Sequence, residues 1–396
     1  MRRLLFIFSL LLLHQGVADA QTKDLPMAKL IDEQFKFAGQ QYKVLAGNVP
    51  TDQMPKTFYP QTGKSENSNT GWWCSGFFPG SLLYIYEYTK DADALKEAKA
   101  RLAILEKEKL NKGTHDLGFM MYCSFGNAYR LFKDPAYKAI IDESAASLST
   151  RYHPGAKVIQ SWNSSKAWAG PVIIDNMMNL ELLGWVTDQG GDKKYKEIAV
   201  NHANSTIKNH FRSDFSSYHV LDYDMKTGDV LQKKTAQGAA DSSAWARGQA
   251  WGLYGFTVMY RMTKDKQYLE QAKKIAAFML NDKNMPADLI PYWDYDAPGI
   301  PDTYRDASAG AIMASALLEL AQYADKKERR RYLDVAEKVI RVLSSDAYRA
   351  KLGENGGFLL LHSVGSLPHK SEVDVPLTYA DYYFLEALLR YKNWYL

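Results

Sequence analysis

The feature that most constrains this sequence is an alternation of two kinds of helical segment. Six segments are apolar on nearly every side, which is typical of buried helices. They begin at Gly76, Asp116, Ile173, Trp245, Ser308 and Thr378. Amphipathic, charged segments follow the first five of them, and a sixth amphipathic segment, LIDEQFKFAGQQYKVL, lies near the N-terminus. The sequence therefore predicts six inner and six outer helices in strict alternation.

Short turns that contain an aspartate separate these paired helices. The aspartates are Asp91, Asp134, Asp192, Asp265 and Asp325. Aspartate is a favoured N-cap residue, so each turn is expected to start the next helix. Helix pairs that cannot bury their apolar faces alone must stack on their neighbours. An open solenoid and a closed ring are both possible, but a chain that ends on an apolar helix favours the ring.

We therefore expect an all-α protein with an (α/α)6 barrel that forms one catalytic domain over residues 21–396. One segment departs from the helical pattern. Residues 218–233 alternate in the manner of strands around Met225-Lys226-Thr227-Gly228, which predicts a small β-hairpin insertion.

The first twenty residues have the pattern of a secretory signal peptide. Arg2 and Arg3 precede an apolar run from Leu4 to Leu13, which is too short to span a bilayer. Ala18-Asp19-Ala20 matches a cleavage site, so export to the periplasm is expected, with no membrane attachment after cleavage. The net charge of +4 arises from balanced basic and acidic residues, which argues against a nucleic-acid partner.

Composition and motifs narrow the possible chemistry. The chain holds 26 Tyr and 9 Trp, and aromatic rings serve both large cores and sugar-binding surfaces. It has no HExxH, CxxC, P-loop, GxSxG or dinucleotide fingerprint, so no metal and no cofactor is expected. Cys74 and Cys123 lie in apolar stretches and could be bridged or free. Carboxylates surrounded by aromatic residues are typical of glycosidases.

Asp175 is the most informative carboxylate. It lies among Ile173, Ile174, Met177 and Met178, where no cap position explains a charge. Burial raises the pKa of a carboxyl group, and a carboxylic acid that stays protonated near neutral pH can act as a general acid. A bond to the backbone or to a neighbouring amide is the structural alternative. Asp116 opens an apolar segment, and there a simple N-cap is an equally good explanation.

Other candidates lie at the expected ends of the inner helices. Trp73 suits a sugar-stacking wall, and His219 with Gln237 could contact a substrate carboxylate. Arg247 lies between two tryptophans and needs an anionic partner, either a protein carboxylate or an acidic sugar. The polar loop from Ser363 to Asp374 could bind a second sugar or a sulfate.

Several of these motifs resemble the unsaturated glucuronyl hydrolases of glycoside hydrolase family 88. The matching strings are WCSGFFPG from Trp73, HDLGF from His115, IDNMMNL from Ile174, SAWARGQAW from Ser243 and DYYFLEAL from Asp381. The rhamnogalacturonyl hydrolases of family 105 tend to have WARGNGW in place of the fourth string. The resemblance extends from about residue 70 to the C-terminus.

The resemblance implies an (α/α)6 barrel that removes a 4,5-unsaturated uronic acid from glycosaminoglycan-derived oligosaccharides by hydrating the C4=C5 double bond. Asp175 matches the acid/base and Asp116 the second catalytic aspartate. Substrate-binding positions are matched by Trp73, His115, His219, Gln237, Arg247, Trp251, Ser363, Ser366 and Lys370. The spacing of Ser363, Ser366 and Lys370 differs from the family pattern. A rhamnogalacturonyl hydrolase and a toroid that only binds sugars are the alternatives.

Overall fold

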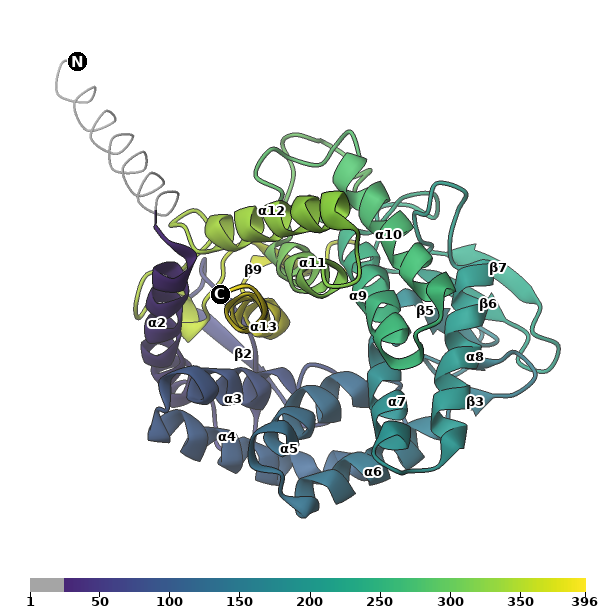
Figure 1. Cartoon of the computed structure of the whole chain (residues 1–396), viewed down its shortest axis with the longest axis horizontal. Coiled ribbons are helices and arrows are strands. Elements are labelled where there is room, and N and C mark those ends of the chain that lie inside the picture. The colour runs from purple at the N-terminus through teal and green to yellow at the C-terminus, as the bar shows by residue number, and fades with distance from the viewer. Residues whose placement is uncertain (1–24) are drawn as a thin grey trace.

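The computed structural model describes residues 25–396, so the predicted signal peptide at residues 1–20 lies outside the described residues. Outer and inner helices alternate along the chain, six of each, and together they form a ring (Figure 1). The outer helices are α2 (Met27–Gly47), α4 (Ala92–Leu105), α6 (Pro135–Ser149), α8 (Lys193–Asn209), α10 (Lys266–Asn281) and α12 (Lys326–Leu343).

The inner layer has six helices. Two of them begin with a differently wound segment, which is the π-helix η2 before α5 and the 3-10 helix η3 before α7. The members are α3 (Phe77–Thr89), η2 with α5 (Gly118–Gly126, Asn127–Phe132), η3 with α7 (Ile174–Asn179, Leu180–Asp188), α9 (Ala246–Thr263), α11 (Ala307–Leu320) and α13 (Thr378–Tyr395). The last inner helix, α13, packs against both α3 and α11, and this closes the ring. The (α/α)6 barrel predicted from the sequence is confirmed.

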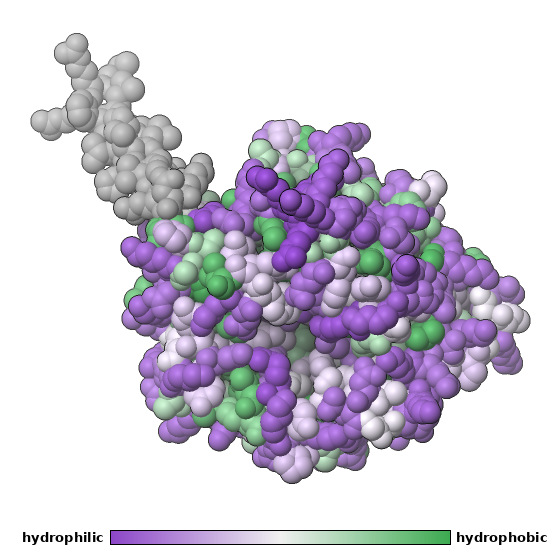
Figure 2. Space-filling model, viewed as in Figure 1, coloured by the Kyte–Doolittle hydropathy of each residue, from purple (hydrophilic) through white to green (hydrophobic). Residues whose placement is uncertain are grey.

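Burial separates the two layers as the hydrophobic pattern predicts. Every residue of the inner helix α11 is buried. The outer helix α12 buries a single stripe, formed by Tyr332, Ala336, Val339, Ile340 and Leu343. Hydrophilic side chains cover most of the molecular face shown in Figure 2, with hydrophobic ones scattered among them. None of the helices in residues 25–396 is long and apolar enough to cross a bilayer.

The aspartate turns cap the outer helices as predicted. The carboxylate of each predicted aspartate accepts a hydrogen bond from the backbone N–H two residues later; these aspartates are Asp91, Asp134, Asp192, Asp265 and Asp325. Three of the preceding inner helices end at a lysine in the left-handed conformation, at Lys90, Lys133 and Lys264. A lysine at a helix C-terminus also complements the helix dipole.

Small β-hairpins fill the connections between helix pairs. The strands are β1 (Met54–Tyr59), β2 (Lys64–Ser68), β3 (Tyr152–His153), β4 (Val158–Ile159), β5 (Pro171–Ile173), β6 (Val220–Tyr223), β7 (Val230–Lys234), β8 (Ser363–Ser366) and β9 (Ser371–Val375). The predicted hairpin corresponds to β6–β7, and β5 adds a third strand to it. The pairs β1–β2, β3–β4 and β8–β9 were not predicted. Short helices η1 (Glu106–Leu110) and η4 (Asn355–Gly357) complete the described chain.

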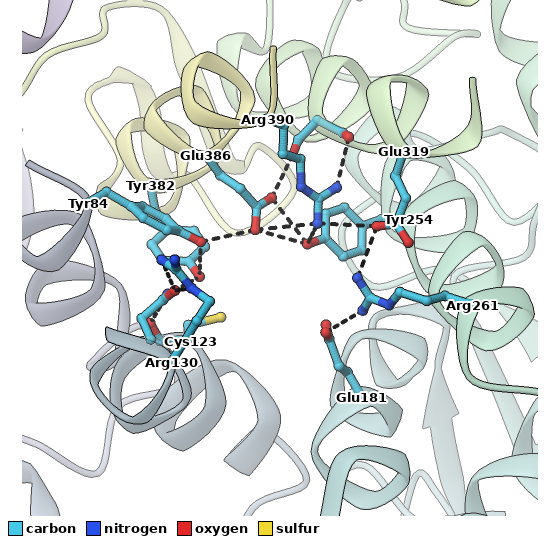
Figure 3. Close-up of polar contacts among 12 residues, drawn as sticks. Tyr84, Cys123, Arg130, Glu181, Tyr254, Arg261, Glu319, Tyr382, Glu386 and Arg390 are labelled. Atoms are coloured by element: carbon cyan, nitrogen blue, oxygen red, sulfur yellow. Dashed lines mark hydrogen bonds and ion pairs between the residues drawn. The ribbon is translucent and has the colours of Figure 1, made fainter. Parts of the chain in front are cut away.

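A network of buried charges occupies the end of the ring where the inner helices finish (Figure 3). Arg390 lies 3.3 Å from Glu319 and 3.6 Å from Glu386. Glu386 also accepts hydrogen bonds from the hydroxyls of Tyr84 and Tyr254. Arg390, Glu386 and the two tyrosines line a cavity of about 370 Å³. Each arginine in its lining pairs with a carboxylate: Arg130 with Glu87, Arg261 with Glu181 and Arg390 with Glu319.

Candidate active site

The opposite end of the ring holds a second cavity, of about 440 Å³, where the inner helices begin. Five inner layers each place a side chain in its lining at or near their first turn. These residues are Trp73, Asp116, Asp175, Arg247 and Tyr379. Because the positive end of each helix dipole lies at its N-terminus, this arrangement favours a negatively charged ligand.

Asp175, in the first turn of η3, has the properties of a general acid. Its side chain is almost fully buried, and Oδ2 has no hydrogen-bond partner among residues 25–396. The neighbouring Asn176 amide donates instead to the carbonyl of Ile159, so it does not satisfy the acid. Burial raises the pKa of Asp175 to about 7, with a further contribution from the charge of Asp116, although Arg247 opposes the shift. The carboxyl group can therefore carry a proton near neutral pH.

Asp116 faces the same cavity and does not act as an N-cap. No capping hydrogen bond joins its carboxylate to helix η2, whose Phe119 N–H donates to the side chain of Asn179. Thr114 Oγ1 donates to Asp116 Oδ2 at 2.9 Å, and His115 Nε2 lies 3.3 Å from Oδ1. Asp116 lies beside the helix start, as the sequence predicts, but the side chain of Asn179 accepts the hydrogen bond that an N-cap would accept.

Gly118 allows the two aspartates to approach each other. A Cβ at this position would lie 2.5 Å from the Cα of Asn179, so any other residue would push η2 away from η3. The start of η2 carries Asp116, and the start of η3 carries Asp175. The missing side chain therefore brings both carboxylates into one cavity.

His219, immediately before β6, is held as a neutral hydrogen-bond donor. Its Nδ1 accepts hydrogen bonds from the backbone N–H groups of Ala236 and Gln237, at 3.0 and 3.1 Å. The proton therefore resides on Nε2, which lies 3.8 Å from Asp175 Oδ2. Burial, with a smaller contribution from Arg247, lowers the pKa of His219 to about 3. The histidine remains neutral at physiological pH and directs its Nε2–H towards Asp175, and it lies behind the cavity lining without being part of it.

Arg247 finds its anionic partner within the protein. Its Nη1 lies 3.2 Å from the fully buried carboxylate of Asp306, the N-cap of α11. The guanidinium also donates to the carbonyls of Val364 and Gly365, so it fastens the β8–β9 hairpin to the barrel. Only its Nε is left without a partner among the described residues.

The remaining predicted residues lie at different depths. Trp73 and His115 line the cavity, as does Gln237, which donates to the Gly365 carbonyl at 3.2 Å. Trp251 is fully buried beside Phe119 and Tyr383, and its indole lies near Asp175 instead of in the lining.

The β8–β9 loop contributes one of its three predicted residues. Ser366 lines the cavity and shares a 2.7 Å hydrogen bond with His369 Nδ1. Ser363 is completely buried on β8, and Lys370 is exposed on the turn, so neither lies in the cavity lining.

Ten residues of the lining are not among the predicted site residues, and four of these are Trp162, His369, Glu372 and Tyr379. His369 and Glu372 belong to the polar loop that the sequence predicts as a contact for a second sugar or a sulfate, but the sequence does not single them out. Tyr379 lies in the first turn of α13. The expectation that the first turns of the inner helices face the site therefore also applies to Tyr379. Trp162, His369 and Glu372 lie in loops or hairpins that reach the cavity only through tertiary packing. Both cysteines are free, with Cys74 buried near this end of the ring and Cys123 near the other.

Comparisons with known proteins show which family the chain resembles. The profile of Glycosyl Hydrolase Family 88 matches residues 50–395. The unsaturated glucuronyl hydrolase of Formosa agariphila is 49% identical over 323 residues, which cover 81% of this chain and 80% of that protein. The crystal structure of an unsaturated glucuronyl hydrolase specific for heparin has a TM-score of 0.89 and 46% identity, covering 92% of this chain and 97% of the other.

A further solved structure carries a bound sugar. It is a mutant of the unsaturated glucuronyl hydrolase from Streptococcus agalactiae in complex with dGlcA-GalNAc6S, with a TM-score of 0.79, 30% identity and 94% coverage of both chains. The match to the family profile extends over most of the sequence and includes all six inner helices of the barrel. The chain belongs to glycoside hydrolase family 88.

Proposed function

We propose that this protein removes a 4,5-unsaturated uronic acid from the non-reducing end of glycosaminoglycan-derived oligosaccharides. The observation that carries the proposal is Asp175, a buried acid with an unpartnered oxygen and a pKa of about 7 in a cavity built from helix N-termini. The names of the related hydrolases support the same substrate class.

The reaction begins with proton transfer from Asp175 to C4 of the unsaturated sugar. Positive charge develops at C5 and the ring oxygen, and a water molecule adds to C5 while its proton returns to the Asp175 carboxylate. The product is a hemiketal, which opens and releases the second sugar. One water molecule is consumed, and the acid is regenerated. An acid with a pKa near 7 suits both proton transfers.

Asp116 supports this cycle electrostatically. Its charge helps to keep Asp175 protonated before the reaction. A carboxylate at this position also stabilises the positive charge that develops in the transition state. Thr114 and His115 hold Asp116 in place.

The carboxylate of the uronic acid needs hydrogen-bond donors that do not depend on pH. His219 Nε2 and Arg247 Nε are both buried and have no acceptor among residues 25–396. Gln237 lines the cavity, and its backbone N–H donates to His219 Nδ1. We assign these three side chains to the uronate, with Trp73 and Trp162 as the aromatic walls that limit the access of water.

The decisive experiment is the loss of ultraviolet absorbance by unsaturated disaccharides from chondroitin, hyaluronan and heparin, with pectin-derived products as the comparison. Turnover of at least one glycosaminoglycan product is expected. Absorbance that stays constant across that set would overturn the proposal, and turnover of pectin products alone would indicate a rhamnogalacturonyl hydrolase. Binding without any turnover would indicate a sugar-binding toroid.

We further propose that the enzyme works in the periplasm after cleavage behind Ala20. The support is the charged, apolar and small-residue pattern of residues 1–20. Mass spectrometry of the secreted protein is expected to give Gln21 as the first residue. An intact Met1 on protein recovered from the periplasm would contradict cleavage.

A further inference from the structure

Glu372, on β9, is a carboxylate in the active-site lining whose charge no neighbour neutralises directly. No hydrogen bond or ion pair to its side chain exists among residues 25–396. Burial raises the pKa of Glu372, and the charges of Lys56 and Arg247 oppose that rise and favour the carboxylate. Neither cation pairs with it directly: the Lys56 ammonium is bound to Glu66 at 2.6 Å and lies over the ring of Trp72, and Arg247 is paired with Asp306. The proposed reaction assigns no task to Glu372.

The carboxylate of Glu372 lies over the backbone of Gly365. A Cβ on Gly365 would be 2.4 Å from Glu372 Oε2, so only glycine leaves room for the glutamate in this orientation. The carbonyl of Gly365 accepts hydrogen bonds from Arg247 and Gln237. Glu372 therefore lies within the cavity, one peptide group away from two residues assigned to the uronate.

Depth within the cavity indicates which part of a substrate Glu372 faces. Asp175 and His115 form the buried floor, where the reacting sugar must contact the acid. Trp72 is 40% exposed and His369 is exposed at the rim, while Glu372 is half-buried between floor and rim. A disaccharide whose first ring contacts Asp175 extends past Glu372 towards Trp72.

We propose that Glu372 is a specificity-determining residue that selects an uncharged hydroxyl group, and rejects a sulfate, on the second sugar. A carboxylate accepts hydrogen bonds from hydroxyl groups, whereas a sulfate ester offers only negative oxygens. Like charges brought together inside an interface are strongly unfavourable and serve as a device for specificity. This inference rests on the proposed function.

The test uses the full-length mature enzyme and a set of unsaturated disaccharides that differ by single sulfates on the second sugar. For Glu372→Gln, which keeps the shape and removes the charge, kcat/KM for at least one sulfated disaccharide is expected to rise by about tenfold or more. For the unsulfated disaccharide, kcat/KM is expected to fall, because the neutral amide oxygen of glutamine accepts a weaker hydrogen bond than a carboxylate does, so the ratio of sulfated to unsulfated kcat/KM rises. Glu372→Ala should move the ratio of sulfated to unsulfated kcat/KM in the same direction.

Asp374→Asn is the matched control, because it removes a carboxylate charge from the same strand at a residue that pairs with His362 and lies outside the cavity lining. Its ratio of sulfated to unsulfated kcat/KM is expected to stay at the wild-type value. An unchanged ratio in Glu372→Gln for every sulfate position would overturn the inference. An equal loss with both substrates would do so too, because Glu372 would then serve the reaction itself. Failure of the wild type on all disaccharides would instead contradict the proposed function.

Discussion

At the scale of single residues, Asp175 sets the pH range in which the enzyme can work. Burial raises the pKa of this carboxyl from 3.8 to about 7, so the proton needed at C4 is present below that pH and lost above it. We expect kcat to fall tenfold for each pH unit above about 7, with a single ionisation. Initial rates measured between pH 5 and 9 on one unsaturated disaccharide test this fall in kcat.

Asp175→Asn provides the companion test. It should lower kcat by at least about 10²-fold, because the amide has no acidic proton, while the affinity measured by calorimetry stays close to that of the wild type. A variant with substantial turnover, or a wild-type rate that is constant from pH 6 to 9, would remove Asp175 from the role of acid.

The same burial makes Asp175 a cost to the stability of the fold. Its pKa is higher in the folded than in the unfolded chain, so the folded state binds more protons and stability falls as pH rises from about 4 to 7. The shift of about 3 units corresponds to roughly 4 kcal/mol at most. The stability advantage of Asp175→Asn over the wild type should therefore grow by about 2.5 kcal/mol between pH 5 and pH 8.

Thermal denaturation at the two pH values checks this result, with Asp222→Asn as a control carboxylate outside the cavity lining. An advantage of Asp175→Asn that is the same at pH 5 and pH 8 would mean that the pKa is not raised in the folded state. The physical origin of the effect is that an acid poised for catalysis lacks the partners that would stabilise its charge.

At the scale of secondary-structure elements, the parallel arrangement of the inner helices explains where the charges lie. Their N-termini surround the catalytic cavity, and their C-termini converge on the network of Figure 3. The dipoles favour cations at the C-terminal end, and three arginines, Arg130, Arg261 and Arg390, line the cavity there. The arginines and their carboxylates are thus part of the barrel's internal charge balance.

This network predicts unequal costs for removing two of its arginines. Arg390 is the counterion of Glu319 and Glu386, which are nearly buried, so Arg390→Met should cost about 3–5 kcal/mol of stability. Arg130 pairs with Glu87 near the surface, and Arg130→Met should cost no more than about 1 kcal/mol. Chemical denaturation compares the two variants, and equal losses would contradict the assignment. Both should retain wild-type kcat, because the catalytic cavity lies at the other end of the ring.

The elements also show what the sequence could and could not reveal. The hydrophobic pattern and the aspartate turns predict the six helix pairs, because both are properties of the local sequence. The same holds for Asp175, which its apolar sequence neighbours identify as a candidate acid. The β8–β9 hairpin is polar, and its sequence predicts only a loop. Its contacts with Arg247, and the position of Glu372 in the cavity, depend on segments more than 100 residues apart. No local pattern records such contacts.

At the scale of the whole molecule, closure of the ring depends on contacts between the two ends of the chain. Gln41 on α2 is fully buried, and its amide binds the backbone of Gly353, Glu354 and Phe358 near the C-terminus. Tyr42 donates to Asp381 on α13. The first outer helix therefore holds the last inner helix in place, and with it Tyr379 in the cavity. The predicted closure thus rests on side chains that periodicity alone does not single out.

The assembled ring should attract its anionic substrate over a distance. The net charge of the full chain is +4, and the N-termini of the inner helices direct a positive potential into the cavity. Salt screens such attraction, so kcat/KM should fall by about two- to tenfold between 20 and 500 mM NaCl, while kcat changes little. A disaccharide whose uronate is converted to a methyl ester is the matched control, and its kcat/KM should be nearly independent of salt. If the acid and the ester showed the same salt dependence, the attraction would not come from the charge of the substrate, and binding in this cavity would rest on local hydrogen bonds alone.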